Sequence, residues 1–232
     1  MTPDISARIL GVKLNKGKPF FFARIGDGAV ECIRGQGRAG HTCDMEAYSL
    51  ELGARLNDAV LALRDGGSRV LWGDWRTAVG GSAPTYVEEW AALVDAPNRQ
   101  LTNYEALLLN RQSRALVAFY ATVRYDRRRK VYIGRDAAGA SSLLQCASGI
   151  TTPMALTLDI DWLRESIERA RPEVILFGAG MGGLCAVVEY WSEHPDVTCI
   201  HLGSALDPYF GHRSRAGQLT QAGAYKLLEP IQ

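Results

Sequence analysis

Short runs of apolar residues alternate with longer amphipathic segments along most of this chain. Runs bounded by glycine, proline or charged residues predict buried strands, and they fall at residues 18–26, 68–75, 99–103, 130–134, 173–180 and 197–203. Residues 149–155 form either a short strand or an extended segment. Apolar positions at helical spacing, several with capping residues, predict helices at 45–63 (capped by Asp44), 84–96, 104–110, 111–123, 139–148, 159–172 and 181–194.

This alternation predicts the fold class. Strands as apolar as "FFFA" and "VILF" are buried on both faces, which is typical of a mostly parallel sheet covered by helices. We therefore expect a single α/β domain over residues 1–232. The stretch 204–225 is polar, rich in glycine and without periodicity, so it predicts a long loop that is either functional or disordered.

Composition narrows the class of protein without naming a function. The formal net charge of +1 does not by itself favour binding to nucleic acid or to membranes. The five cysteines are scattered and form no C-x-x-C pair, so we expect free thiols in a reducing compartment rather than zinc or disulfides. No apolar signal core or membrane-length apolar stretch is present, and we expect a soluble cytoplasmic protein without a membrane partner.

Polar residues and glycines gather where the predicted strands end. In an open parallel sheet, ligands bind beyond the carboxyl ends of the strands, so these positions are the candidate site. Acidic residues at strand ends are candidates for catalysis, including general-base catalysis. These candidates are Asp27, Asp74, Glu105 and Asp207.

The sequence "GAGMGG" at 178–183 fits the pattern G-x-G-x-x-G between a strand and a helix. Glycines at such a turn let the backbone approach a phosphate, and a helix N-terminus favours negative charge. Tight packing of the turn explains the same glycines equally well. The next strand ends in His201-Leu202-Gly203 rather than in an acidic residue, which disfavours NAD. The phosphate-binding candidates are Gly178, Gly180, Gly182, Gly183 and, after the next strand, Ser204.

The sequence "RIGDGAVE" follows the first predicted strand. Arg24 can bind a phosphate or carboxylate with two parallel hydrogen bonds. Asp27 can bind a divalent metal or a ribose hydroxyl, and Gly26 leaves room for the backbone to approach a ligand. The alternative is an Arg24–Asp27 ion pair that only closes the end of the strand.

The stretch "FFARIGDGAVECIRG" resembles the opening motif of the GT-D type glycosyltransferases, which reads arginine, hydrophobic, Gly-Asp-Gly-Glu. The helix containing "MEAYSLELGARL", the late "VILFGAGMGGLCAVV" and the strand before "HLGSALDP" follow in matching order over about two thirds of the chain. The resemblance implies a Rossmann-like α/β fold. It also implies transfer of a hexosyl or pentosyl group from a nucleotide diphosphate donor, such as a UDP-sugar, to an acceptor hydroxyl.

The resemblance also implies that an Asp-x-Glu pair holds the donor diphosphate through a divalent metal, Mn or Mg. Asp27 matches the aspartate of that pair, but Ala29 stands where the glutamate belongs. Glu31 lies about one helical turn after Asp27 and is the candidate replacement for the second metal ligand. The departure at Ala29 puts the metal dependence in question.

Two clusters of basic residues suggest an anionic acceptor. The candidates are a hydroxymethylated pyrimidine in DNA, as in phage-type DNA modification, or a glycan. A solvated helix end is the alternative explanation of the first cluster. The two clusters are Arg127, Arg128, Arg129 and Lys130, and Arg213 with Arg215.

Three functions therefore remain open. The first is a nucleotide-sugar-dependent glycosyltransferase. The second is a nucleotide- or dinucleotide-binding oxidoreductase, which rests on "GAGMGG" alone. The third is a non-catalytic nucleotide-sugar-binding protein that has lost its metal ligand, for which Ala29 is the evidence.

Overall fold

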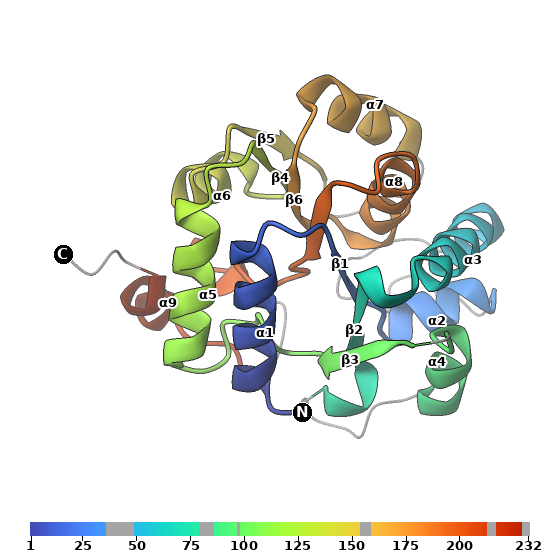
Figure 1. The fold of residues 1–232 in the computed structure, drawn as a ribbon, viewed down its shortest axis with the longest axis horizontal. Helices are drawn as coiled ribbons and strands as arrows, with labels where there is room; N and C mark the ends of the chain where they lie inside the picture. The colour runs from blue at the N-terminus through green and yellow to red at the C-terminus, as the bar shows by residue number, and fades with distance from the viewer. Residues whose placement is uncertain (36–48, 79–85, 97, 154–158, 213–216, 229–232) are drawn as a thin grey trace.

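The computed structural model describes residues 1–35, 49–78, 86–96, 98–153, 159–212 and 217–228. Within these ranges seven strands form one parallel sheet in the order β3-β2-β1-β7-β6-β4-β5 (Figure 1). The strands are β1 (Phe21–Arg24), β2 (Val70–Asp74), β3 (Gln100–Asn103), β4 (Lys130–Gly134), β5 (Ser148–Thr151), β6 (Val174–Gly178) and β7 (Thr198–His201).

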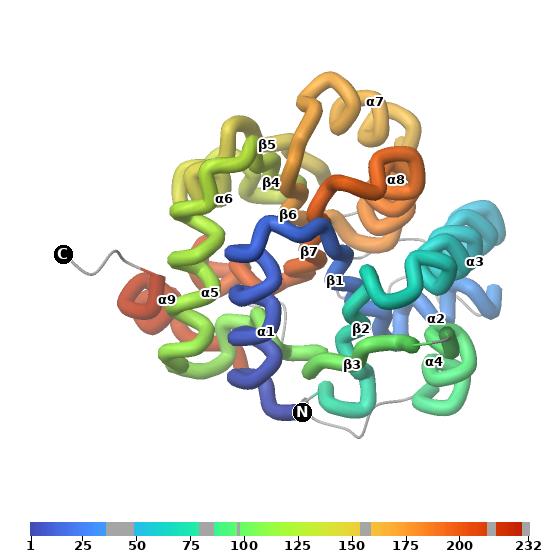
Figure 2. Tube along the Cα trace, viewed as in Figure 1, coloured from blue at the N-terminus to red at the C-terminus, as the bar shows by residue number. Residues whose placement is uncertain are grey.

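Helices cover both faces of this sheet (Figures 1 and 2). One layer holds α2 (Asp27–Ile33), α3 (Leu50–Asp65), α4 (Val87–Leu93), α7 (Ile160–Ala170) and α8 (Gly180–Glu193). The other holds α1 (Pro3–Asn15), α5 (Arg114–Tyr125), α6 (Ala137–Leu144) and α9 (Gln221–Leu228). The described residues also form three short 3₁₀ helices, η1 (Gly67–Arg69), η2 (Trp75–Thr77) and η3 (Asp207–Phe210).

The apolar strands separate two hydrophobic cores. Alternate residues of β1 point to opposite faces, so Phe21 packs with α3 and α8 while Phe22 packs with α1 and α5. All residues of β1 and β4 are buried, as expected for central strands of a parallel sheet. The predicted α/β class with a mostly parallel, helix-flanked, Rossmann-like sheet is thus confirmed.

We call the end of the sheet where the strands finish its carboxyl edge, and the opposite end its amino edge. At the carboxyl edge, the chain leaves neighbouring strands toward opposite helix layers. β1 and β6 lead into α2 and α8 in one layer, whereas β4 and β7 lead into α6 and η3 in the other. In open α/β sheets, ligands bind beyond the carboxyl ends of the strands at such a divergence. The four central strand ends β1, β7, β6 and β4 therefore define the candidate site.

Several elements differ from the sequence predictions. Helix α1 was not predicted, although Thr2 caps it and Pro3 occupies its first turn. Helix α3 begins at Leu50 with Ser49 as its cap, and Asp44 lies outside the described residues. The predicted loop at 204–225 contains η3 and the start of α9, whose Ala224 is buried. None of the helices in the described ranges is both long and apolar enough to cross a bilayer.

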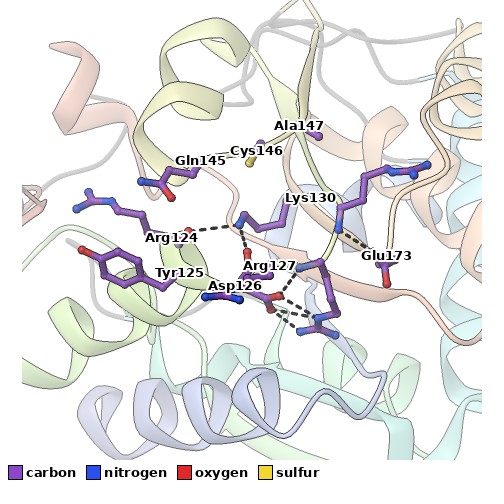
Figure 3. A pocket seen from close by; sticks show the side chains of 11 residues that line it. Arg124, Tyr125, Asp126, Arg127, Lys130, Gln145, Cys146, Ala147 and Glu173 are labelled. Carbon is purple, nitrogen blue, oxygen red and sulfur yellow. Dashed lines mark hydrogen bonds and ion pairs between the residues drawn. The ribbon is translucent and has the colours of Figure 1, made fainter.

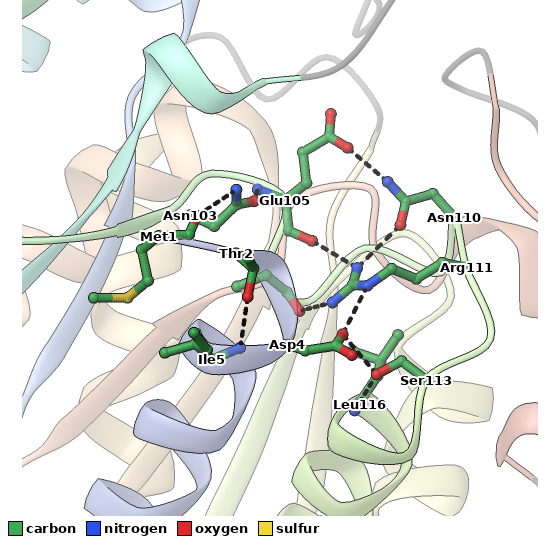
Figure 4. Close-up of polar contacts among 11 residues, drawn as sticks. Met1, Thr2, Asp4, Ile5, Asn103, Glu105, Asn110, Arg111, Ser113 and Leu116 are labelled. Atoms are coloured by element: carbon green, nitrogen blue, oxygen red, sulfur yellow. Dashed lines mark hydrogen bonds and ion pairs between the residues drawn. The ribbon is translucent and has the colours of Figure 1, made fainter.

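The helix predicted at 104–110 is wrong, because this segment folds into turns. The Asn103 side chain accepts a hydrogen bond from the Glu105 N–H at 2.9 Å, which satisfies that donor outside a helix. The Arg111 guanidinium donates to the carbonyl oxygens of Glu105 and Ala106 (Figure 4). Side chains thus satisfy the backbone groups that a helix would have used.

Candidate functional site

The strand ends lie level at the carboxyl edge of the sheet. Arg24 of β1 is paired with Gly73 of β2, and Gly134 of β4 is paired with Gly178 of β6. β7 lies between β1 and β6, and its His201 is paired with Phe177. Neighbouring strands are about 4.8 Å apart, so the ends of β1 and β6 lie on the order of 10 Å from each other.

Arg24 is buried, with 4% of its surface exposed, and it ties three strand ends together. Its Nε donates to the carbonyl oxygen of Tyr104 after β3, and its Nη1 donates to that of Leu202 after β7, both at 2.8 Å. Its guanidinium carbon also lies 4.4 Å from the centre of the Tyr104 ring. These contacts occupy two of the five N–H donors and give Arg24 a structural role at the edge.

Gly26 is required by the packing of an aromatic pair beneath the β1 end. A Cβ atom at this position would lie 2.7 Å from the Tyr104 hydroxyl and 3.4 Å from the Trp75 ring. Those two rings pack edge to face with centroids 4.8 Å apart. Close packing against Tyr104 and Trp75 therefore explains the first glycine of the "GDG" motif without any ligand.

Asp27 is exposed at the first residue of α2. Its Oδ1 accepts a hydrogen bond from the Gly28 N–H at 2.9 Å, and a carboxylate is favoured at a helix N-terminus. Glu31 follows four residues later on the same helix, as the sequence predicted. Within the described ranges no three His, Cys, Asp or Glu side chains are grouped to hold a metal ion.

The "GAGMGG" turn connects β6 to α8, and its glycines have separate steric reasons. A Cβ on Gly178 would lie 2.3 Å from the carbonyl oxygen of Gly203, and one on Gly183 would lie 2.4 Å from the Ala179 Cβ. Gly180 has φ of +65°, a conformation that favours glycine. Gly182 is buried in the first turn of α8, whose N-cap Ala179 offers no capping side chain. The backbone N–H groups of that first turn are therefore available to an anion.

Two acidic candidates on the β2 and β3 side are engaged by neighbouring side chains. Asp74 accepts hydrogen bonds from the Nε and Nη2 of Arg76, both at 2.8 Å. Glu105 is buried, and its Oε2 accepts from the Asn110 amide at 2.6 Å (Figure 4). Proton transfer by Asp74 would first require that its ion pair with Arg76 be broken.

Asp207 belongs to a cluster of charged side chains that was not predicted from the sequence. Its Oδ2 lies 3.6 Å from the Nη2 of Arg135, which follows β4. The Nε of Arg135 lies 3.5 Å from Asp136, and the Nε2 of His212 lies 3.2 Å from the same carboxylate. Arg135, Asp136, Asp207 and His212 thus form one network, which we call the edge cluster.

The buried phenol of Tyr132 lies close to the edge cluster. The hydroxyl of Tyr132 would lie 2.9 Å from a Cβ on Gly134 and 3.6 Å from one on Gly178, which places it under the ends of β4 and β6. Burial, followed by the negative charges of Asp207 and Asp136, raises the pKa of Tyr132 well above its ordinary range. Tyr132 is therefore a neutral neighbour of this cluster at physiological pH.

The basic run at 127–130 lies at the other edge of the sheet. It leads into β4, whose first residue is Lys130, and it lines a pocket of about 670 Å³ with residues that precede β5 and β6 (Figure 3). Arg128 donates to Asp126, to Thr198 and to the Leu14 carbonyl, and the ammonium of buried Lys130 donates to the carbonyls of Arg124 and Asp126. Arg127 and Arg129 are exposed. The run is therefore not brought together with Asp27 and the "GAGMGG" turn.

We predict that Asp126→Asn destabilises the protein by about 2 kcal/mol at pH 7, because the carboxylate accepts charge-assisted hydrogen bonds from Arg128. Burial alone would raise the pKa of Asp126, but these hydrogen bonds outweigh burial and lower it. A carboxyl pKa lowered by folding contributes stability above its unfolded value, and this contribution is lost as pH falls through the folded value. In urea unfolding measured from pH 7 downward, the difference in unfolding free energy between wild type and variant should decrease as the pH falls. Exposed Asp95→Asn is the control, with an expected change below about 0.5 kcal/mol.

The structure thus gathers Arg24, Gly26, Asp27, the "GAGMGG" turn, Ser204 and Asp207 along the ends of β1, β7 and β6. Arg213 and Arg215 lie outside the described residues. Comparison of the chain with protein-family models, with curated proteins and with solved structures finds no match. The candidate site therefore rests on its own geometry.

Proposed function

We propose that this protein is a nucleotide-sugar-dependent glycosyltransferase whose donor diphosphate binds at the carboxyl edge, between Asp27 and the "GAGMGG" turn. The observation that carries the proposal is the continuous contact from β1 to β6. Arg24 donates to the carbonyl of Leu202, and Gly203 in turn closely approaches Gly178. The motif that resembles the GT-D type and the late glycine turn therefore share one rim.

The chemistry of the rim suits a diphosphate leaving group. The first turn of α8 offers backbone N–H donors and the positive end of a helix dipole, which stabilise negative charge that develops on a departing phosphate. Asp27, with Glu31 on the same helix face, could hold a divalent cation that bridges to the diphosphate. Such a metal would neutralise charge on the leaving group.

The position of the basic run bears on the acceptor. Phosphates bound by Arg127 and Arg129 would lie at the amino edge, separated from the proposed donor site by the length of β4. A strand of five residues spans about 17 Å. This placement favours a small glycan acceptor over DNA held by that run.

The proposal is tested by incubating the protein with a panel of UDP- and GDP-sugars, with and without Mn²⁺ or Mg²⁺, and measuring release of nucleoside diphosphate. Oligosaccharides and an oligonucleotide containing 5-hydroxymethylcytosine serve as acceptors. We expect release from at least one donor, accelerated by one acceptor class. Release from none of the donors, together with thermal stabilisation by NAD or NADP, would favour an oxidoreductase instead. Stabilisation by a nucleotide sugar without turnover would indicate a binding protein.

A further inference from the structure

The edge cluster contains a carboxylate–histidine pair to which no role has yet been given. The Nε2 of His212 lies 3.2 Å and 3.4 Å from the two oxygens of Asp136. Asp136 occupies the N-cap position of α6 but makes no side-chain capping bond, so its carboxylate is directed to His212 and Arg135 instead. The backbone N–H of His212 donates to the carbonyl of Asp207 at 2.9 Å, which fixes the residue at the rim.

This arrangement sets the tautomer of the imidazole. A hydrogen bond from Nε2–H to the Asp136 carboxylate leaves Nδ1 with its lone pair. In the part of the chain that the structure describes, Nδ1 of His212 has no hydrogen-bond partner. The side chain is 37% exposed, so a substrate can reach the ring.

The pair also lies next to the proposed donor position in the strand order. Asp136 follows β4, whose Gly134 is paired with Gly178 of the "GAGMGG" turn. Asp27 follows β1, on the opposite side of that turn in the strand order. A donor placed between β1 and α8 would therefore have the edge cluster on the side of β4.

We propose that His212, oriented by Asp136, is the general base that accepts the proton of the acceptor hydroxyl. This inference rests on the proposed glycosyltransferase function. The hydroxyl proton moves to Nδ1 as the hydroxyl oxygen forms a bond to the anomeric carbon. The bond from that carbon to the diphosphate oxygen breaks, and its electron pair leaves with the diphosphate. The resulting imidazolium is stabilised by Asp136.

The charged surroundings suit this role. The groups that face the pair are Asp136 and Arg135 at the start of α6, Asp207 of η3, and the neutral Tyr132 phenol below. The Arg135 guanidinium lies between the two carboxylates and limits their repulsion. A single displacement of this kind inverts the configuration at the anomeric carbon.

The test compares His212→Gln, His212→Ala and Asp136→Asn with the wild type. The control is His194→Gln, because His194 also lies beside a carboxylate, 3.7 Å from Glu168, but at the end of α8 away from the rim. The probe is release of nucleoside diphosphate from the donor on which the wild type is active, with unfolding curves confirming that each variant folds.

We expect kcat to fall on the order of 100-fold or more in both His212 variants, while the donor KM changes less than threefold. Added imidazole should restore part of the activity of His212→Ala, the product should show an inverted anomeric centre by NMR, and His194→Gln should behave as the wild type. If the wild type is active and the kcat of His212→Gln is within threefold of the wild-type value, His212 is not the base. Retention of the anomeric configuration in the product would also exclude it. No turnover by the wild type on any donor would instead overturn the glycosyltransferase proposal, and this inference with it.

Discussion

Replacing Arg24 with alanine is expected to destabilise the protein by about 3–5 kcal/mol. The buried guanidinium donates to the carbonyl oxygens of Tyr104 and Leu202, and its removal leaves both acceptors unsatisfied next to a cavity. The free energy of unfolding of a typical domain is about 5–15 kcal/mol, so this loss is a large fraction of the total. Urea unfolding monitored by tryptophan fluorescence measures it.

Two further variants distinguish the cause of this destabilisation. Arg127→Ala removes an exposed arginine of the amino edge and should change stability by less than about 0.5 kcal/mol. Arg24→Lys keeps the charge but cannot direct two donors along the planar fork of a guanidinium, so it should remain destabilised. If Arg24→Ala unfolds at the wild-type urea concentration, the guanidinium does not hold the three strand ends together.

The second large effect is expected at Asp27. Asp27→Ala should lower turnover of a nucleotide sugar by about 100-fold or more, which corresponds to about 2.7 kcal/mol of transition-state stabilisation. The side chain is exposed, and among the described residues it accepts a hydrogen bond only from the neighbouring Gly28 N–H, so its removal leaves the core intact. Steady-state kinetics and unfolding curves of the same preparation separate the two effects.

Glu51→Ala is the matched control for Asp27→Ala. Glu51 is also an exposed acidic residue in the first turn of a helix, here α3, and its loss should cost about as much helix stability. Both variants should therefore unfold within about 1 kcal/mol of the wild type. Full turnover by Asp27→Ala would exclude Asp27 from donor binding and from catalysis.

The sequence predicted most of the strands because they are buried on both faces, which leaves short apolar runs bounded by glycine, proline or charged residues. The exposed edge strand β5 has no such run, and the sequence predicted it only as a strand or extended segment. It failed at 104–110, where "EALLLN" has helical character but Asn103 and Arg111 take its backbone hydrogen bonds. It also missed α1, although Thr2 and Pro3 mark its start and Leu10 and Leu14 pack in the same core as residues of α5.

The sequence predicted the site residues that directly follow a strand. It missed those that loops bring to the site from distant parts of the sequence. Asp27 and the "GAGMGG" turn each directly follow a strand, so the strand order alone brings them to one edge. The pairing of Asp136 with His212 spans 76 residues and depends on how η3 packs against α6, which no local pattern encodes. The basic run ends at the first residue of β4, so its position in the sequence already implied the opposite edge.

A crystal structure of the protein with a bound nucleoside diphosphate would show whether the donor site lies where we propose it. We expect the two phosphates at the carboxyl edge, with the first turn of α8 on one side and Asp27 on the other. Phosphates bound in the amino-edge pocket beside Arg127 and Lys130, or absence of binding at saturating UDP and GDP, would contradict it.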